Sequence, residues 1–218
     1  MILVPGASSA GGSVFPTVRV PPHRRKFTSN AVERTIEQIR TSTIDRELAW
    51  LFENCFPNTL DTTVDHGSRD GKPDTYVITG DIDAMWLRDS SAQVWPYLPL
   101  LGDDPELQRL VRGVIHRQAC FILLDPYANA FYKDEKRISE WRENDLTEMK
   151  PGVHERKWEI DSLCYPIRLS YGYWKATTGR DVFDEEWKLA MKAVLRTFRE
   201  QQRLDGMGPY SFQRRTSW

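Results

Sequence analysis

Apolar residues recur at helical spacing in six stretches of the chain, separated by segments without such a period. In the first stretch, Asn30 with Glu33 three residues later forms a capping-box pattern. In the second, Ile44, Leu48 and Leu51 fall on one face, as in an amphipathic helix. The predicted helices span residues 30–39, 42–56, 89–98, 105–124, 159–177 and 184–204.

Long polar segments separate some of these helices. Residues 57–84 are predicted to be a loop, because DHGSRDGKPD from Asp65 to Asp74 consists of turn-forming residues. The run TYVIT at 75–79 is β-prone but too short and isolated to predict a sheet. A second polar loop is expected over 126–157. Helix pairs joined alternately by short turns and long loops predict an all-α fold. Hairpins arranged around a ring, with the long loops at one mouth, would give this alternation.

The first residues have no periodicity. Residues 5–25 are rich in proline, glycine and serine and end in a basic run from His23 to Lys26. We therefore expect a disordered N-terminal arm over residues 1–26, followed by a folded domain over residues 27–218. The start of the chain lacks the features of a signal peptide, and no stretch is long and apolar enough to span a bilayer. These observations leave the cellular compartment open.

The composition excludes several classes of protein. The 218 residues carry 30 Lys and Arg against 31 Asp and Glu, so nucleic acid is not an expected partner. The four histidines and three cysteines have no metal-ligand spacing, and there is no glycine-rich nucleotide loop, so neither a metal nor a cofactor is expected. Eight tryptophans are more than a core of this size usually requires. Tryptophan stacks on sugar rings, although core packing is the simpler interpretation for any single one.

The segment GDIDAMWLRDSSAQ holds the highest density of candidate functional side chains. It carries Asp81, Asp83, Trp86, Arg88 and Asp89. An arginine donates a fork of hydrogen bonds, an aspartate accepts from hydroxyl groups, and a tryptophan offers an apolar face, a combination suited to a sugar. The alternative is that Asp89 caps the third helix and Arg88 makes a salt bridge.

A second candidate segment is KWEIDSLCY, which contains Glu159 and Asp161. On a helix, residues two apart point away from each other, so these carboxylates are not expected to form a pair by themselves. One could line a cavity while the other caps the fifth helix, and a capping or surface role is the simpler interpretation of each.

Four segments together closely resemble glycoside hydrolase family 125, a family of metal-independent exo-acting α-mannosidases that prefer α-1,6 linkages. The resemblance covers about residues 27–215. It is carried by LFENCFPNTLDTTV, GDIDAMWLRDSSAQVWPYLPL, DPYANAF and KWEIDSLCYPIRLSYGYWKATTG. It implies an (α/α)6 toroid, incomplete in this chain, and an α-mannoside glycan as substrate. Arg88 and Asp89 are the residues that the resemblance favours for holding hydroxyls of the terminal mannose.

The resemblance also implies an inverting mechanism, in which one carboxylic acid protonates the leaving oxygen and a second carboxylate activates water. In the family the acid follows the stretch that GPYSFQRRTSW begins, and the base lies further on, so both are expected beyond Trp218. The carboxylates of Asp81, Asp83, Asp89, Glu159 and Asp161 then fit substrate binding better than proton transfer. Two alternatives remain: a non-catalytic mannose-binding module or inactive fragment, and a different inverting toroid enzyme that acts on glucosides.

Overall fold

The computed structural model describes residues 15–215, which form a predominantly helical fold with little sheet. Six of its α-helices have eight residues or more. The α-helices are α1 (Asn30–Ser42), α2 (Arg46–Cys55), α3 (Asn58–Thr62), α4 (Leu87–Val94), α5 (Pro105–Leu124), α6 (Ile160–Thr177) and α7 (Glu185–Gln201). Two 3₁₀ helices are η1 (Pro22–Arg24) and η2 (Trp95–Asp103). The strands are β1 (Val64–Arg69), β2 (Lys72–Val77), β3 (Met85–Trp86), β4 (Ala130–Phe131) and β5 (Val153–Glu155).

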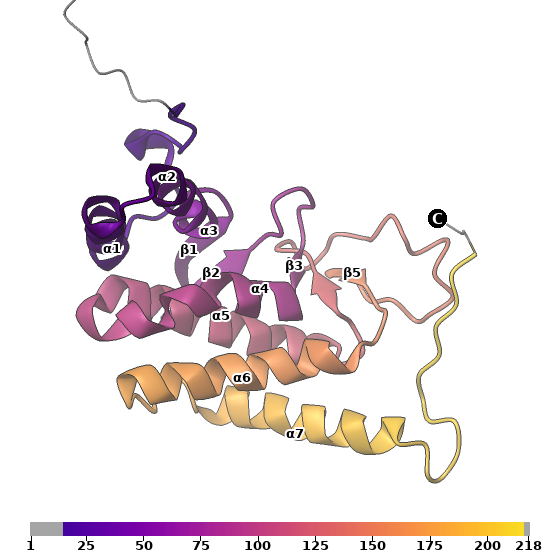
Figure 1. Cartoon of the computed structure of the whole chain (residues 1–218). Coiled ribbons are helices and arrows are strands. Elements are labelled where there is room, and N and C mark those ends of the chain that lie inside the picture. Colours follow the sequence, from indigo (N-terminus) through magenta and orange to yellow (C-terminus); the bar gives the residue numbers. More distant parts are fainter. Residues whose placement is uncertain (1–14, 216–218) are drawn as a thin grey trace, which may run out of the picture.

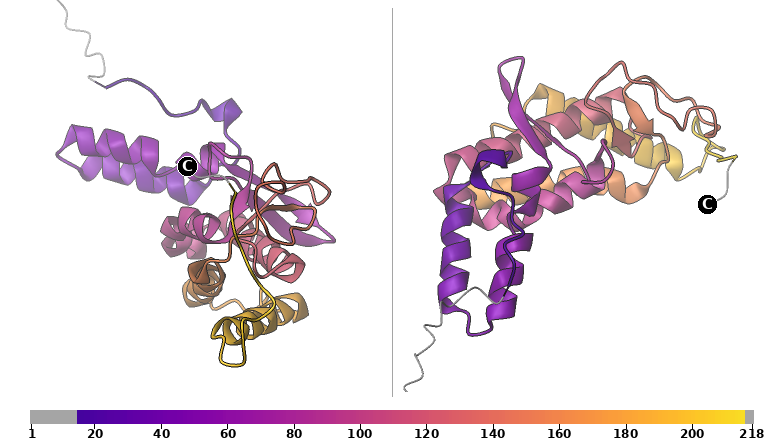
Figure 2. Two further views of the ribbon diagram at one scale, coloured as in Figure 1. Left: turned by 90° about the vertical axis from the view of Figure 1, so that its right-hand side faces the viewer. Right: turned by 90° about the horizontal axis from the view of Figure 1, so that it is seen from above.

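Alternate helices are neighbours in this fold. Helix α4 packs against α6, α5 packs against α7, and β2 lies along α5. The longer helices α5, α6 and α7 run side by side, whereas the α1–α2 pair projects away from them (Figures 1 and 2). The small β3–β4–β5 sheet, the long loop and the C-terminal segment gather at one end of the helices. Within residues 15–215, no helix combines the length and apolar character needed to cross a bilayer.

The start of the first helix differs from the prediction. Ser29, not Asn30, is the N-cap of α1, and its Oγ accepts a hydrogen bond from the Val32 N–H at 3.2 Å. The same hydroxyl donates to Asp104 Oδ2 at 2.7 Å, and Asp104 caps α5 by accepting from the Leu107 N–H at 3.0 Å. The caps of two helices are therefore joined through one buried hydrogen bond.

A β-hairpin replaces most of the loop that was predicted over 57–84. Strands β1 and β2 pair antiparallel from Val64 opposite Val77 to Arg69 opposite Lys72. The turn residues Asp70 and Gly71 both adopt positive φ, of 51° and 78°, as a type I′ turn requires. The Asp-Gly dipeptide was the local signal for this hairpin. The β-prone run alone was not sufficient to indicate it, because its stability comes from burial of β2 against α5.

The contact between β2 and α5 requires a glycine at position 113. A Cβ atom at Gly113 would lie 2.8 Å from the backbone nitrogen of Thr75. A backbone atom cannot move aside as the end of a flexible side chain can. We expect Gly113→Ala to lower the free energy of unfolding by about 1–3 kcal/mol, even though alanine favours a helix over glycine. Urea unfolding measures this change. Gly102→Ala is the control, because a Cβ there meets nothing within 4 Å, and an equal effect of both variants would contradict the close approach.

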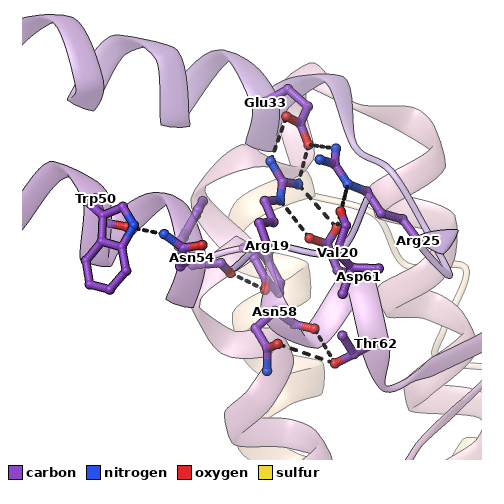
Figure 3. Close-up of polar contacts among 11 residues, drawn as sticks. Arg19, Val20, Arg25, Glu33, Trp50, Asn54, Asn58, Asp61 and Thr62 are labelled. Carbon is purple, nitrogen blue, oxygen red and sulfur yellow. Dashed lines mark hydrogen bonds and ion pairs between the residues drawn. The ribbon is translucent and has the colours of Figure 1, made fainter. Parts of the chain in front are cut away.

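The described part of the N-terminal segment lies against α1 and α3 (Figure 3). Arg19 Nε donates to Asp61 Oδ2 at 2.7 Å, and its terminal nitrogens donate to both oxygens of Glu33 at 2.5 and 3.0 Å. Arg25 pairs with the same two carboxylates, at 3.3 Å from Glu33 and 3.7 Å from Asp61. Two guanidinium groups therefore neutralise Asp61, whose side chain is 2% exposed. These contacts fall within the predicted arm of residues 1–26, whose first 14 residues lie outside the described range.

Helix α2 presents part of its apolar face to solvent. Ile44 precedes the helix and is fully exposed, and Leu48 and Leu51 are 57% and 42% exposed. Together with Phe52, and with Pro96 of η2, the two leucines line an open apolar groove. Amphipathic spacing therefore identified the helix correctly, but its apolar stripe is only partly covered by residues 15–215.

Candidate functional site

The first turn of α4 carries Arg88 and Asp89. The helix follows directly after β3, and its N-cap position is occupied by Trp86, whose backbone is extended. Asp89 is the third residue of the helix, so the alternative that it caps the helix is wrong. An acidic side chain in the first turn is favoured by the partial positive charge of the helix N-terminus.

The start of α6 lies beside the start of α4. Arg88 Nη1 donates to Asp161 Oδ2 at 2.9 Å and lies 3.5 Å from Glu159 Oε2, while Arg88 Nε is 3.5 Å from Asp89 Oδ2. Glu159 occupies the N-cap position of α6 with an extended backbone, and its side chain makes no capping hydrogen bond. Because Glu159 precedes the helix, helical spacing does not separate it from Asp161, and both carboxylates reach the same guanidinium. These four residues, Arg88, Asp89, Glu159 and Asp161, are called the Arg88 cluster below.

Two carboxylate oxygens of the Arg88 cluster are buried and accept no hydrogen bond, although each lies near the Arg88 guanidinium. They are Asp89 Oδ2 and Glu159 Oε2. The hydrogen bond to Asp161 raises the pKa of Arg88, so its charge is permanent. Burial raises the pKa of Glu159, and the nearby Arg88 opposes that rise. The cluster therefore combines a fixed cation with acceptor oxygens, which is the chemistry needed to bind neighbouring hydroxyl groups.

Comparison with known proteins places this chain in a family. Residues 45–218 match the metal-independent α-mannosidases of glycoside hydrolase family 125. This chain belongs to glycoside hydrolase family 125. The resemblance noted in the sequence is thereby confirmed.

Two relatives of this family 125 chain illustrate the match. The meiotically up-regulated gene 157 protein of Schizosaccharomyces pombe is 41% identical over 184 residues, covering 81% of the chain and 36% of the relative. A solved Streptococcus pneumoniae metal-independent α-mannosidase, in a non-productive complex with α-1,6-mannobiose, is 38% identical with a TM-score of 0.80. That match covers 88% of this chain and 44% of the solved one. The family 125 chain therefore spans less than half the length of each relative.

The remaining predicted site residues of this family 125 chain, Asp81, Asp83 and Trp86, make contacts with residues outside the Arg88 cluster. Asp81 accepts a hydrogen bond from Thr79, and Asp83 pairs with Arg137 at 3.1 Å with its side chain 75% exposed. Within residues 15–215, Arg88 pairs with Asp89, Glu159 and Asp161 and with neither of these two aspartates. Trp86 is half-buried and meets the ring of His154 edge-on, with 5.1 Å between ring centroids. Among residues 15–215, no group of His, Cys, Asp and Glu side chains has the arrangement of a metal site.

Asn129 and His154 lie beside the site, but the sequence patterns did not indicate them as site residues. Asn129 lies in the DPYANAF segment that contributed to the family resemblance, and that membership was the available signal. His154 lies in β5, within the segment that was predicted as a long polar loop, and an isolated histidine there carries no spacing signal. It accepts or donates a hydrogen bond with the Tyr132 hydroxyl at 2.7 Å, and burial lowers its pKa.

Glu159→Gln is expected to reduce the loss of stability of this family 125 chain as the pH rises. Since burial raises the folded pKa of Glu159, the folded state holds that proton more tightly than the unfolded chain. The resulting stabilisation is present at acid pH and is lost as the pH rises from about 4.3 through the folded pKa. Thermal unfolding at a series of pH values tests this, with the exposed Asp83→Asn as control. If the melting temperature depends on pH identically in Glu159→Gln and in the wild type, the raised pKa of Glu159 is ruled out.

Proposed function

We propose that this chain is the N-terminal, substrate-binding part of an exo-α-mannosidase that removes terminal α-1,6-linked mannose from glycans. The observation that carries the proposal is the Arg88 cluster. It brings one guanidinium and three carboxylates together at the starts of two neighbouring helices. In the proposal, Arg88 donates to mannose hydroxyls, and the carboxylates of Asp89 and Glu159 accept from them. Trp86 offers an apolar face nearby, and Asp81, Asp83 and Asp161 line or order the approach to the sugar.

The packing of the helices supports the (α/α)6 toroid that the proposal includes. In such a toroid the helices alternate between an inner and an outer ring, so that alternate helices become neighbours. Here α4 contacts α6 and α5 contacts α7, and the Arg88 cluster requires that α4 and α6 start at the same end. The open apolar groove beside α2 is a surface that further helices of the ring would cover. A folded domain over residues 27–218 is the corresponding domain proposal.

The proposed reaction is inverting and independent of a metal. An inverting glycosidase needs a carboxylic acid and a carboxylate about 6.5–9.5 Å apart, so that a water molecule fits between the sugar and the base. We assign neither role to the Arg88 cluster, because its carboxylates are held by a guanidinium and suit hydroxyl binding. In the proposal the acid and base belong to parts of the family sequence beyond Trp218.

Two measurements test the proposal: binding by this chain, and hydrolysis by the enzyme that includes the segments beyond Trp218. Titration calorimetry with α-1,6-mannobiose should show binding, whereas the corresponding α-1,6-linked glucose disaccharide should not bind. NMR of an enzymatic digest should show β-mannose as the first product, since inversion changes the anomer, and chelation with EDTA should leave the rate unchanged. Binding without any hydrolysis would favour a non-catalytic mannose-binding module, and hydrolysis of a glucoside alone would overturn the proposed specificity.

A further inference from the structure

Asn129 connects the two backbone segments that carry the Arg88 cluster. Its carbonyl accepts from the Leu87 N–H at 3.1 Å, directly before Arg88. Its side-chain Oδ1 accepts from the Lys157 N–H at 3.1 Å, two residues before Glu159. Asn129 is 1% exposed, so these hydrogen bonds form away from water. The side chain and the backbone of Asn129 therefore hydrogen-bond to both of the segments that carry the cluster.

The carboxylate of Glu155 extends this connection. The Asn129 N–H donates to the Glu155 carbonyl at 3.1 Å, and Asn129 Nδ2 donates to Glu155 Oε2 at 2.7 Å. The other oxygen, Oε1, accepts from Arg214 at 2.7 Å. Arg214 also forms two hydrogen bonds, at 2.6 and 2.8 Å, with Asp145, whose side chain is fully buried.

The C-terminal segment also contacts the backbone between β5 and α6, through Tyr210. The Tyr210 hydroxyl accepts from the Trp158 N–H at 2.7 Å and donates to the Arg156 carbonyl at 3.1 Å. Its ring stacks on Tyr127 with 4.8 Å between centroids. The backbone immediately before Glu159 is thus held from two sides, by Asn129 and by Tyr210.

We propose that Asn129 is a positioning residue for the Arg88 cluster, and that Glu155 and Arg214 hold it in its orientation. This inference rests on the proposed function in assigning sugar binding to the cluster. Among the described residues, the hydrogen bonds of Asn129 go to Leu87, Glu155 and Lys157 and to none of the cluster side chains. It sets the separation of the Leu87–Asp89 and Lys157–Glu159 backbones, and so decides whether Arg88 and Glu159 face the same ligand. Binding groups require placement within a fraction of an ångström, so a small shift of either backbone weakens binding.

Asn129→Asp tests the inference with almost no change of shape. The new carboxylate still accepts from Lys157, but it cannot donate to Glu155 and is repelled by it. We expect binding of α-1,6-mannobiose to weaken by about tenfold or more, since misplacement of about 1 Å can cost a factor of 100. We also expect the pKa of Glu159, followed by carboxyl ¹³C NMR, to move away from its wild-type value, because the burial of Glu159 and its distance from Arg88 both change. Asn54→Asp is the matched control, because Asn54 makes a hydrogen bond to Trp50 within α2, and it should change neither quantity.

A rescue experiment distinguishes positioning from general damage. In the double variant Asn129→Asp/Glu155→Gln, the donor and the acceptor exchange places, since the new amide can donate to the new carboxylate. Recovery of the Glu159 pKa and of mannobiose binding is expected. If the wild-type chain does not bind mannobiose, the proposed function fails, but the NMR titration still decides the positioning role.

The inference is overturned if folded Asn129→Asp retains the wild-type pKa of Glu159. It is also overturned if the double variant behaves like the single variant. Should Asn129→Asp fail to fold, Arg214→Lys replaces it, because lysine keeps the charge near Glu155 but cannot make two parallel hydrogen bonds to Asp145. A smaller change in the Glu159 pKa is then expected, and an unchanged pKa overturns the inference.

Discussion

Arg88→Ala is expected to weaken binding of α-1,6-mannobiose at least 100-fold. Hydrogen bonds from a charged donor contribute about 1.5–3 kcal/mol each, and loss of two of them corresponds to that factor or more. The substitution also leaves the carboxylates of Asp89, Glu159 and Asp161 without their shared cation. The pKa of Glu159 should therefore rise further in this variant, because Arg88 now lowers it.

Titration calorimetry and carboxyl NMR measure these two effects. Arg88→Lys should recover part of the electrostatic effect on Glu159 but little of the affinity, since an ammonium group lacks the planar fork of donors. Arg40→Ala is a suitable control, because Arg40 is more than half exposed and pairs with Glu37 in α1, outside the cluster. Mannobiose affinity in Arg88→Ala equal to that of the wild type would remove the Arg88 cluster from the proposed function.

Arg19→Ala is expected to lower the free energy of unfolding by about 3 kcal/mol, because breaking a buried ion pair from one side leaves an uncompensated charge. The charge in question is the Asp61 carboxylate, whose side chain is 2% exposed. Arg25 remains in the variant, but it lies 3.7 Å from Asp61 and makes a weaker pair. The loss should be smaller at acid pH. The pKa of folded Glu33 is lowered chiefly by its hydrogen bond to Arg19, so that contribution is lost as the pH falls through the folded pKa.

Urea unfolding at neutral and acid pH measures the effect of Arg19→Ala. Arg40→Ala is the matched control, since Arg40 forms an ion pair with Glu37 in which both side chains are more than half exposed. Exposed pairs of this kind contribute about 1 kcal/mol or less. If the two variants lose the same stability, the described N-terminal segment contributes nothing specific to the fold.

Local signals in the sequence were sufficient for most helices. Residues 105–124 were predicted from the Asp104–Pro105 start and an apolar stripe, and the structure places α5 over those residues. Helices α6 and α7 also begin within about one residue of their predicted starts. The backbone hydrogen bonds of a helix join residues that are four apart in the sequence. The position of a long helix can therefore be predicted from the local sequence. Side-chain motifs of the same kind carried the family resemblance.

The β-hairpin and the Arg88 cluster depended on contacts between distant residues. Strand β2 is stable because it lies along α5, where Gly113 admits the backbone of Thr75, and a pattern within residues 64–77 does not contain that contact. The sequence named Arg88 and Asp161 as separate candidates, but they are 73 positions apart. Only the packing of α4 against α6 brings them within 2.9 Å. Periodicity and capping thus determined the helices of this protein, because those signals are local. The tertiary structure alone decided which charged groups share a site, because Coulomb and hydrogen-bond interactions depend on distance in space and not on separation along the chain.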